Sequence, residues 1–380
     1  PHPNYHGTDS FSFTAYDGIE HSEAAIITIN VLPVNDNPVI NSIPSLEITQ
    51  GHTYQYPITM HDIDGDDLTI TVPNKPDWMS VINNNTHSLY FDGDDDYVSM
   101  GDPVNLDVGS EDFTIKVVFK VDPSALESGK THVLVSKRGY SLGNGFEVSV
   151  GNNGMLQAYL LDNSGVTVFY ASSELGEGTE VADGQWHTAH AVFDRDENGR
   201  IYLDGVSGPA VSLGQQGNID NDYSFSIGNN AQQSNIRGLK GYIEQVVIWN
   251  YALNYSEVQE SQLESVSGNE IGLLGAWNID EGGGNSLYDL TNNNSDGIIH
   301  NALWSNEIPF SSLLYGTPNL TDGGLNNVTI NINDGNGGSA NQNFSLAVAV
   351  THLEISGESG FRLLSSPVSG AVFGDLLEEL

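Results

Sequence analysis

The chain has 380 residues, enough for two or three domains that each have a hydrophobic core. Acidic residues outnumber basic ones by 50 to 11, so the net charge of −39 argues against nucleic-acid partners and anionic lipid and favours divalent cations, Ca²⁺ first. There is no cysteine to ligate a metal, and no apolar run approaches the ~20 residues of a membrane span, so we expect no membrane insertion.

Short alternating runs rich in Val, Ile, Thr, Tyr and Phe, separated by Gly, Asn and Ser, predict a fold that is nearly all β. The first two runs, at 9–16 and 25–31, flank an Asp17-Gly18 turn and predict a hairpin. We expect it to be the last hairpin of a domain that begins upstream, in a longer protein. Residues 1–38 would hold this hairpin and a linker that ends at Pro38.

A second domain begins after this linker and is interrupted. Its three early strands are too few, because a sandwich needs about seven. Later runs, joined by an Asp334-Gly335 turn, can supply the missing strands. The predicted early strands span 46–49, 54–59 and 68–72, and the late ones span 327–333 and 342–350. We therefore predict one split domain made of 39–84 plus 311–351.

The intervening residues 85–310 differ in composition from both flanks. They hold nine of the 11 basic residues and four of the five tryptophans. We predict that they form a separate domain inserted into a surface loop of the split one. Residues 352–380 would begin a further segment.

Two motifs carry a resemblance for the outer parts. Tyr5-x-Gly7-x-Asp9, with the Asp17-Gly18 turn and the Asn35-Asp36-Asn37 linker, resembles the cadherin-like repeats of large bacterial surface proteins. The split domain, with its Asp62-Ile-Asp64-Gly loop and Asp334-Gly335 turn, resembles the dystroglycan-type, immunoglobulin-like variant of these repeats. The resemblance implies β-sandwiches that act as spacers.

Residues 89–260 resemble a laminin G-like or pentraxin-like jelly roll of the concanavalin A type. The motifs that carry this resemblance are Leu89-Tyr-Phe-Asp92-Gly, Asp183-Gly-Gln-Trp186-His187, Ile201-Tyr-Leu-Asp204-Gly and Gly241-Tyr-Ile-Glu244. The predicted fold class is therefore all-β, with cadherin-like or Ig-like β-sandwiches and an inserted concanavalin A-like jelly roll.

Calcium at the junction of tandem domains is implied by the cadherin-like resemblance. Carboxylates, amides and backbone carbonyls suit Ca²⁺, which takes six to eight oxygen ligands. The alternative is that these Asp and Asn residues only form turns. The residues that match the junction site are Asn35, Asp36, Asn37, Asp62, Asp64 and Asp334.

A second calcium site is implied by the jelly-roll resemblance, with Asp92, Asp95 and Glu244 as candidate ligands and solvated loop carboxylates as the alternative. EF-hand loops are excluded by spacing. The best match, which begins at Asp194, places a glycine at the twelfth position, where a bidentate acid is required. We expect an Asn198-Gly199 hairpin turn there instead.

The sequence does not predict an enzyme. Glycosidases on this scaffold need two facing carboxylates, and no Glu-x-Asp-x-Glu run occurs. His187 and His190 are three residues apart on a predicted strand, so they should point to opposite faces and cannot share a metal. Serine-nucleophile, zinc and phosphate-loop motifs are also lacking from the sequence.

Binding is the function that remains. Four basic residues, Lys137, Arg138, Arg237 and Lys240, could form a patch on an acidic surface, or could be solvated strand residues. Tyr140 and Tyr170 would suit stacking on sugar rings. We predict a secreted or cell-surface module that binds calcium, neighbouring domains and a glycan or cell-surface ligand in adhesion. The alternatives are a purely structural jelly roll and a non-catalytic appendage of a secreted hydrolase.

Overall fold

The computed structural model describes residues 2–66, 68–83, 86–139, 143–162, 165–170, 180–213, 217–231, 237–263 and 266–350. The chain divides into two compact units, one from Pro1–Val81 with Leu314–Leu380 and the other from Ile82–Leu313. The expected further segment 352–380 lies outside the described residues. Within the described part, the helices are all too short or too polar to cross a membrane.

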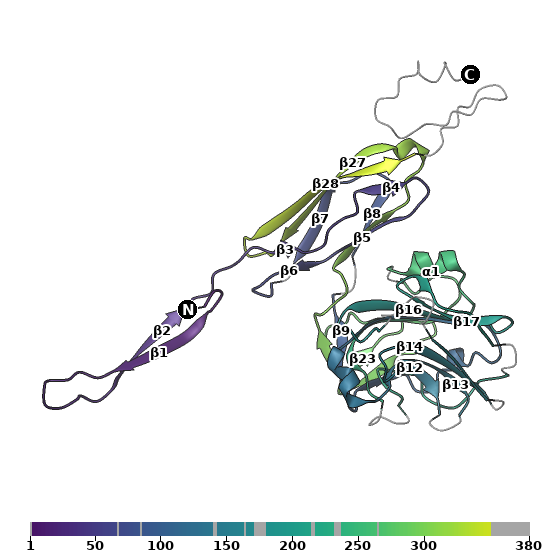
Figure 1. The fold of residues 1–380 in the computed structure, drawn as a ribbon, viewed down its shortest axis with the longest axis horizontal. Coiled ribbons are helices and arrows are strands. Elements are labelled where there is room, and N and C mark those ends of the chain that lie inside the picture. The colour runs from purple at the N-terminus through teal and green to yellow at the C-terminus, as the bar shows by residue number, and fades with distance from the viewer. Residues whose placement is uncertain are drawn as a thin grey trace, which may run out of the picture. The chain divides into compact units, whose positions relative to one another are not determined.

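The N-terminal hairpin is confirmed (Figure 1). Strands β1 (Gly7–Phe13) and β2 (Ala25–Val31) pair antiparallel over their whole length. At the tip, the side chain of Asp17 accepts hydrogen bonds from the backbone N–H groups of Ile19 and Glu20, which closes the Asp17-Gly18 turn. These hydrogen bonds lower the pKa of Asp17, since they stabilise its carboxylate.

The rest of the first unit has two main sheets that share one core. One sheet has the order β5-β26-β8 and the other β4-β28-β27-β7, while β3 pairs with β6. In each main sheet, strands from before residue 84 pair with strands from after residue 311. The strands are β3 (Val39–Ile40), β4 (Glu47–Thr49), β5 (Tyr54–Ile58), β6 (Met60–His61), β7 (Thr69–Asn74), β8 (Met79–Asn83), β26 (Ser312–Gly316), β27 (Gly324–Asn333) and β28 (Ser339–Ala349).

Alternation explains this core. In β5 the side chains of Tyr54, Tyr56 and Ile58 are buried, while the residues between them are partly exposed. They pack with Leu314 from β26 and Ile330 from β27, so both sheets contribute. The expectation of only three strands before residue 84 was wrong. Strands β3 and β6 have two residues each, too few to show alternation, and the five-residue β8 was missed.

The second unit consists of two larger sheets around one core. Their orders are β15-β14-β13-β12-β20-β10-β24-β23 and β18-β17-β16-β11-β21-β9-β25, with β19 paired to β17 and β22 to β21. The core is lined from β11, where Phe113 stacks on Phe193 of β16 at 4.2 Å between ring centroids. The strands are β9 (Ser88–Asp92), β10 (Tyr97–Ser99), β11 (Phe113–Val121), β12 (His132–Arg138), β13 (Gly145–Val150), β14 (Leu156–Asp162), β15 (Gly165–Tyr170), β16 (Trp186–Phe193), β17 (Asn198–Leu203), β18 (Val206–Ser207), β19 (Val211–Ser212), β20 (Ser226–Ile227), β21 (Lys240–Trp249), β22 (Leu273–Asn278), β23 (Ser286–Leu287), β24 (Gly297–His300) and β25 (Leu303–Ser305).

A short helix covers part of the outer face of the nine-stranded sheet (Figure 1). Helix α1 (Tyr255–Ser261) begins at Asn254, whose side chain accepts from the N–H groups of Ser256 and Glu257. The Asn254 N–H donates to the Glu257 carboxylate at 2.7 Å, which completes a capping box. Val258 of α1 packs against Val247 and Trp249 of the sheet. This part of the outer face is therefore buried by packing against α1.

The hairpin between β16 and β17 corrects a detail of the sequence prediction. Asn198 and Gly199 do not form its turn, because Gly199 already pairs with Phe193 in the ladder. The turn is Asp194–Glu197, in which the Glu197 N–H bonds to both the backbone and side-chain oxygens of Asp194. An aspartate at the first turn position stabilises this alternative to an Asn-Gly turn.

Candidate functional site

Three aspartates after β6 form an acidic cluster in the first unit. Asp62, Asp64 and Asp66 each offer a carboxylate oxygen, and these oxygens lie within 4.8 Å of one another. Asp62 is 5% exposed; its Oδ1 accepts from the Asp64 N–H at 2.8 Å, while its Oδ2 is buried without a hydrogen-bond partner among the described residues. A buried, unpaired carboxylate oxygen is costly unless a ligand satisfies it.

Of the linker residues predicted as ligands, Asp36 contacts this cluster, while Asn35 and Asn37 contact the turn between β27 and β28 and the start of β28. The Asp36 N–H donates to Asp64 Oδ2 at 2.7 Å, and the Asn35 side-chain amide donates to Asp334 Oδ2 at 2.7 Å. The Ser339 N–H donates to Asn37 Oδ1 at 3.2 Å. The linker therefore contacts both acidic loops, but through donor groups of Asn35 and Asp36 rather than through their oxygens.

Asp334 is held tightly in the turn between β27 and β28. Its Oδ1 accepts from the N–H groups of Asn336 and Gly338 at 2.8 and 2.9 Å. The Asn35 amide and these N–H groups hold the pKa of Asp334 below its ordinary value. A Cβ at position 338 would lie 2.1 Å from Asp334 Oδ2, so this close approach requires glycine.

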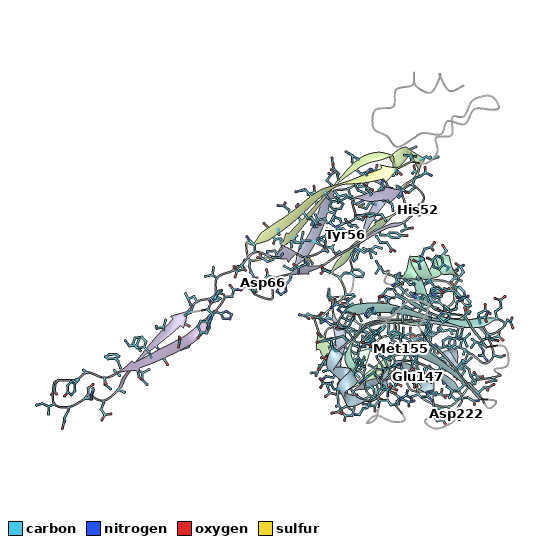
Figure 2. All side chains as sticks on the ribbon, viewed as in Figure 1. His52, Tyr56, Asp66, Glu147, Met155 and Asp222 are labelled. Atoms are coloured by element: carbon cyan, nitrogen blue, oxygen red, sulfur yellow. The ribbon has the colours of Figure 1, made fainter. Side chains whose placement is uncertain are left out.

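The Asp62–Asp64–Asp66 group fits a hard cation. All of its donors are oxygens, and three carboxylates can supply much of the shell of six to eight oxygens that Ca²⁺ takes. Asp62 Oδ2 and Asp66 Oδ2, both buried without a hydrogen-bond partner among the described residues, are the atoms that such an ion would satisfy. Asp66 (Figure 2) was not predicted as a ligand, although its alternation with Asp62 and Asp64 was the available signal.

The predicted acids of the second unit separate into two places. The loop after β9 holds Asp92, Asp95 and Asp96, in which the Asp92 N–H donates to Asp96 Oδ2 at 2.7 Å. Burial, followed by repulsion from Asp92 and Asp95, raises the pKa of Asp96 to about 6. Asp96 is thus the most perturbed acid of this loop, and the sequence analysis did not select it.

Glu244 is not beside this loop. The β9–β21 register places Lys240 opposite Asp92 and Ile243 opposite Leu89. Glu244 therefore lies four residues further along β21 than the partner of Asp92, about 13 Å at strand spacing. The structure does not bring Glu244 to Asp92, although sequence motif matching had grouped them.

The four basic residues selected from the sequence do not form one patch. Lys137 is buried, and its Nζ lies 2.7 and 3.0 Å from carboxylate oxygens of Asp102 and Asp107. Lys240 donates to Ser124 Oγ at 2.6 Å. Adjacent strand residues point to opposite faces, so Lys137 and Arg138 could not both serve one surface. Tyr140 and the Tyr170 side chain lie outside the described residues.

Arg138 and Arg237 instead converge on Glu147 of β13. Arg138 Nε donates to Glu147 Oε2 at 2.8 Å. Arg237 binds the carboxylate in a bidentate manner, with Nη1–Oε2 at 3.0 Å and Nη2–Oε1 at 2.6 Å. Glu147 is fully buried, whereas the side chains of Arg138 and Arg237 are 10% and 16% exposed.

Strand register completes this arrangement. Phe146 and Val148 point into the core, so Glu147 between them points outward from the eight-stranded sheet. Its cross-strand partners are Ser136 on β12 and Tyr159 on β14. The Arg138 guanidinium lies 5.5 Å from the centroid of the Tyr159 ring, within cation–π range. We call Arg138, Glu147, Tyr159 and Arg237 the arginine–glutamate cluster.

His187 and His190 point to opposite faces of β16, as predicted. His190 is buried on the side of α1, where Nε2 lies 3.0 Å from Ser261 Oγ, and burial lowers its pKa well below the ordinary value. His187 instead lies between Asp204 and Asp183, with Nδ1–Oδ2 at 2.7 Å and Nε2–Oδ1 at 3.2 Å. Burial alone would lower the pKa of His187, but the two carboxylates outweigh it and raise the pKa.

Residues 92–259 match the family described as the concanavalin A-like lectin/glucanases superfamily. They form a laminin G-like domain of that class, which confirms this part of the sequence prediction. No curated protein matches the chain.

Solved structures show only distant likeness. A proposed carbohydrate binding protein from Bacteroides ovatus is 16% identical, with a TM-score of 0.42 over 68% of this chain and 70% of that one. The CBM40 of the Ruminococcus gnavus IT-sialidase is 13% identical, with a TM-score of 0.37 over 46% of this chain and 96% of that one. The binding domain of Paraclostridial Mosquitocidal Protein 1 is 16% identical, with a TM-score of 0.35 over 54% and 49%. Likeness at this level carries no argument about ligands.

Proposed function

We propose that the laminin G-like unit binds glycans through the outward face of its eight-stranded sheet. The observation that carries this proposal is the arginine–glutamate cluster, which places two guanidinium groups and a tyrosine ring around one buried carboxylate. Sugar recognition uses such a combination, because hydroxyl groups need oriented polar partners and ring faces stack on aromatic side chains.

A packing role alone accounts poorly for the cluster. Burying three charged groups costs several kcal/mol per ion, and a hydrophobic set of similar volume is often as stable. The same sheet face also carries Ser149 and Gln157, both buried, with Gln157 Nε2 donating to Ser149 Oγ at 3.3 Å. A polar sheet face with oriented side chains is better explained by ligand binding than by stability.

We propose binding without catalysis at this site. Both oxygens of Glu147 accept hydrogen bonds from arginines, so the carboxylate is engaged in binding these side chains. A glycosidase also needs a second acid, ~5 to 9.5 Å away. Glu147 is the sole acid of β13, which gives no support for such a pair on this strand.

We propose a calcium-binding spacer role for the first unit. The support is the buried Asp62 Oδ2 within a group of three aspartates, together with linker residues tied to Asp64 and Asp334. We assign this unit and the N-terminal hairpin to cadherin-like or immunoglobulin-like repeats, in a secreted or surface-exposed bacterial adhesion protein. An appendage of a secreted hydrolase is the alternative setting, and it leaves the binding role unchanged.

A glycan array probed with the full chain tests the binding proposal. Tyr159→Leu should lose most array signal, because leucine keeps apolar bulk on the strand but removes the aromatic face. Tyr255→Leu, on the exposed surface of α1, is the matched control and should bind as the unchanged chain does. Equal signals from both variants would contradict the proposed site, and no signal on any glycan would contradict the function.

A further inference from the structure

The acidic and basic side chains of the arginine–glutamate cluster differ in their exposure to solvent. Glu147 is fully buried, while the arginines above it keep 10% and 16% exposure. Two arginines and one glutamate leave one net positive charge, and the exposed part of that charge is guanidinium. This is unusual for a chain with a net charge of −39. The small part of this ion-pair group that reaches solvent belongs to the arginine side chains.

The guanidinium of Arg138 is held but not saturated. Within the described part of the chain, it donates to Glu147 only through Nε, while the Tyr159 ring supports its face at 5.5 Å. A fixed guanidinium presents its remaining N–H groups as a planar fork, which matches the two oxygens of a carboxylate. Arg237 already uses its own fork on Glu147, so it anchors the carboxylate that positions Arg138.

We propose that Arg138 binds the carboxylate of an acidic sugar, such as a uronic or sialic acid; this inference rests on the proposed glycan-binding function of the same sheet face. The sugar ring would stack near Tyr159, and the buried Asn230 lies beside the Arg138 strand. Asn230 Nδ2 donates to Ser136 Oγ and to the Arg138 carbonyl, both at 3.2 Å, which places it beside the guanidinium-bearing strand. A neutral sugar would leave the net positive charge unmatched.

Titration calorimetry with the full chain tests this assignment using two matched ligand pairs. Sialyllactose is compared with lactose, and tetragalacturonate is compared with its methyl ester, which removes the charge and keeps the sugar. We expect the carboxylated member of one pair to bind, and its neutral partner to bind at least about tenfold more weakly. Which pair binds distinguishes a sialic acid from a uronic acid.

Variants test the residue. Arg138→Gln should weaken binding of the acidic sugar about tenfold or more, because it removes the fork but leaves the bidentate Arg237–Glu147 pair. Arg138→Lys keeps the charge and should fall between Arg138→Gln and the unchanged chain. Arg200→Gln, on the other sheet, removes the same charge and should leave affinity unchanged. If Arg138→Gln lowers the melting temperature, Arg138→Lys tests the same side chain with its charge retained.

The outcomes separate this inference from the proposed function. Equal affinity for the charged and neutral member of a pair would overturn the carboxylate assignment and leave glycan binding intact. Affinity lost equally in Arg138→Gln and Arg200→Gln would also overturn it, since a general charge effect would then suffice. Failure of every glycan on the array would overturn both.

Discussion

Both units hold carboxylates away from water, but they neutralise them differently. In the first unit, the buried Asp62 and Asp334 accept from backbone N–H groups and the Asn35 amide, and one buried oxygen each of Asp62 and Asp66 has no partner among the described residues. In the second unit, both oxygens of Glu147 are satisfied by arginine. The first arrangement can gain from an added cation, whereas the second is complete and can only use its surplus positive charge.

Removal of the carboxylate from the second arrangement should have the largest effect. Glu147→Ala leaves two nearly buried guanidinium groups without a counter-ion and should cost about 3–5 kcal/mol of the free energy of unfolding of the laminin G-like unit. Calorimetric melting of the full chain measures this. The matched control, Glu127→Ala, removes an exposed acid from the same unit. A loss no greater than in this control would show that the cluster is solvated.

Calcium should act mainly on the first unit. At a hundredfold excess over Kd, an ion that binds only the folded state adds about 2.7 kcal/mol to its stability. Asp62→Asn and Asp64→Ala should remove most of this gain, because each deletes an acid of the cluster. Melting in chelator, in millimolar calcium and in sodium of equal ionic strength measures the effect.

Asp77→Asn is the control for the calcium experiment, since Asp77 is an exposed acid of the same unit. It should keep the calcium response. Identical melting curves with chelator and with calcium would contradict the calcium site and indicate that these aspartates only form turns. A calcium response that survives in Asp62→Asn would place the ion elsewhere.

A smaller effect of pH is expected in the second unit at His187. Its pKa is raised by Asp204 and Asp183, so the folded state binds the proton more tightly than the unfolded state does. This contribution to stability is fully present below the ordinary pKa of about 6.5 and is lost as pH rises through the raised value. The melting temperature of His187→Gln should therefore fall less between pH 6 and pH 8. Parallel profiles for both proteins would contradict the assignment.

The smallest effect should come from removal of the inserted residues. A Cβ on Gly316 of β26 would lie 2.2 Å from the Trp78 carbonyl, just before β8, so the start of β26 and the end of β8 lie at the same end of their sheet. A short Gly-Ser linker can then join Asn83 to Ser311 across a hairpin. We expect the first unit to keep its melting temperature and calcium response. Loss of cooperative melting would show that it depends on the insert.

Local chemistry explains why much of the fold could be predicted. The hairpin at Asp17-Gly18, the buried alternation of β5 and the paired strands around Asp334-Gly335 follow from turn residues and period-two patterns that act over a few residues. The laminin G-like motifs likewise mark local strands and turns. Short strands such as β3 and β6 carry too few residues for a period to be read.

The two candidate sites differ in the same way: one follows from local sequence and the other from tertiary structure. The proximity of Asp62 and Asp64 could be predicted from the sequence, because closely spaced acids in one loop must lie together. The arginine–glutamate cluster was decided by the tertiary structure, because Ser136, Glu147 and Tyr159 become neighbours only through the register of β12, β13 and β14. Register depends on how the whole sheet packs over its core, and a shift of one residue would turn Glu147 inward. That long-range choice, and not any local pattern, brings Arg138 and Arg237 to the same carboxylate.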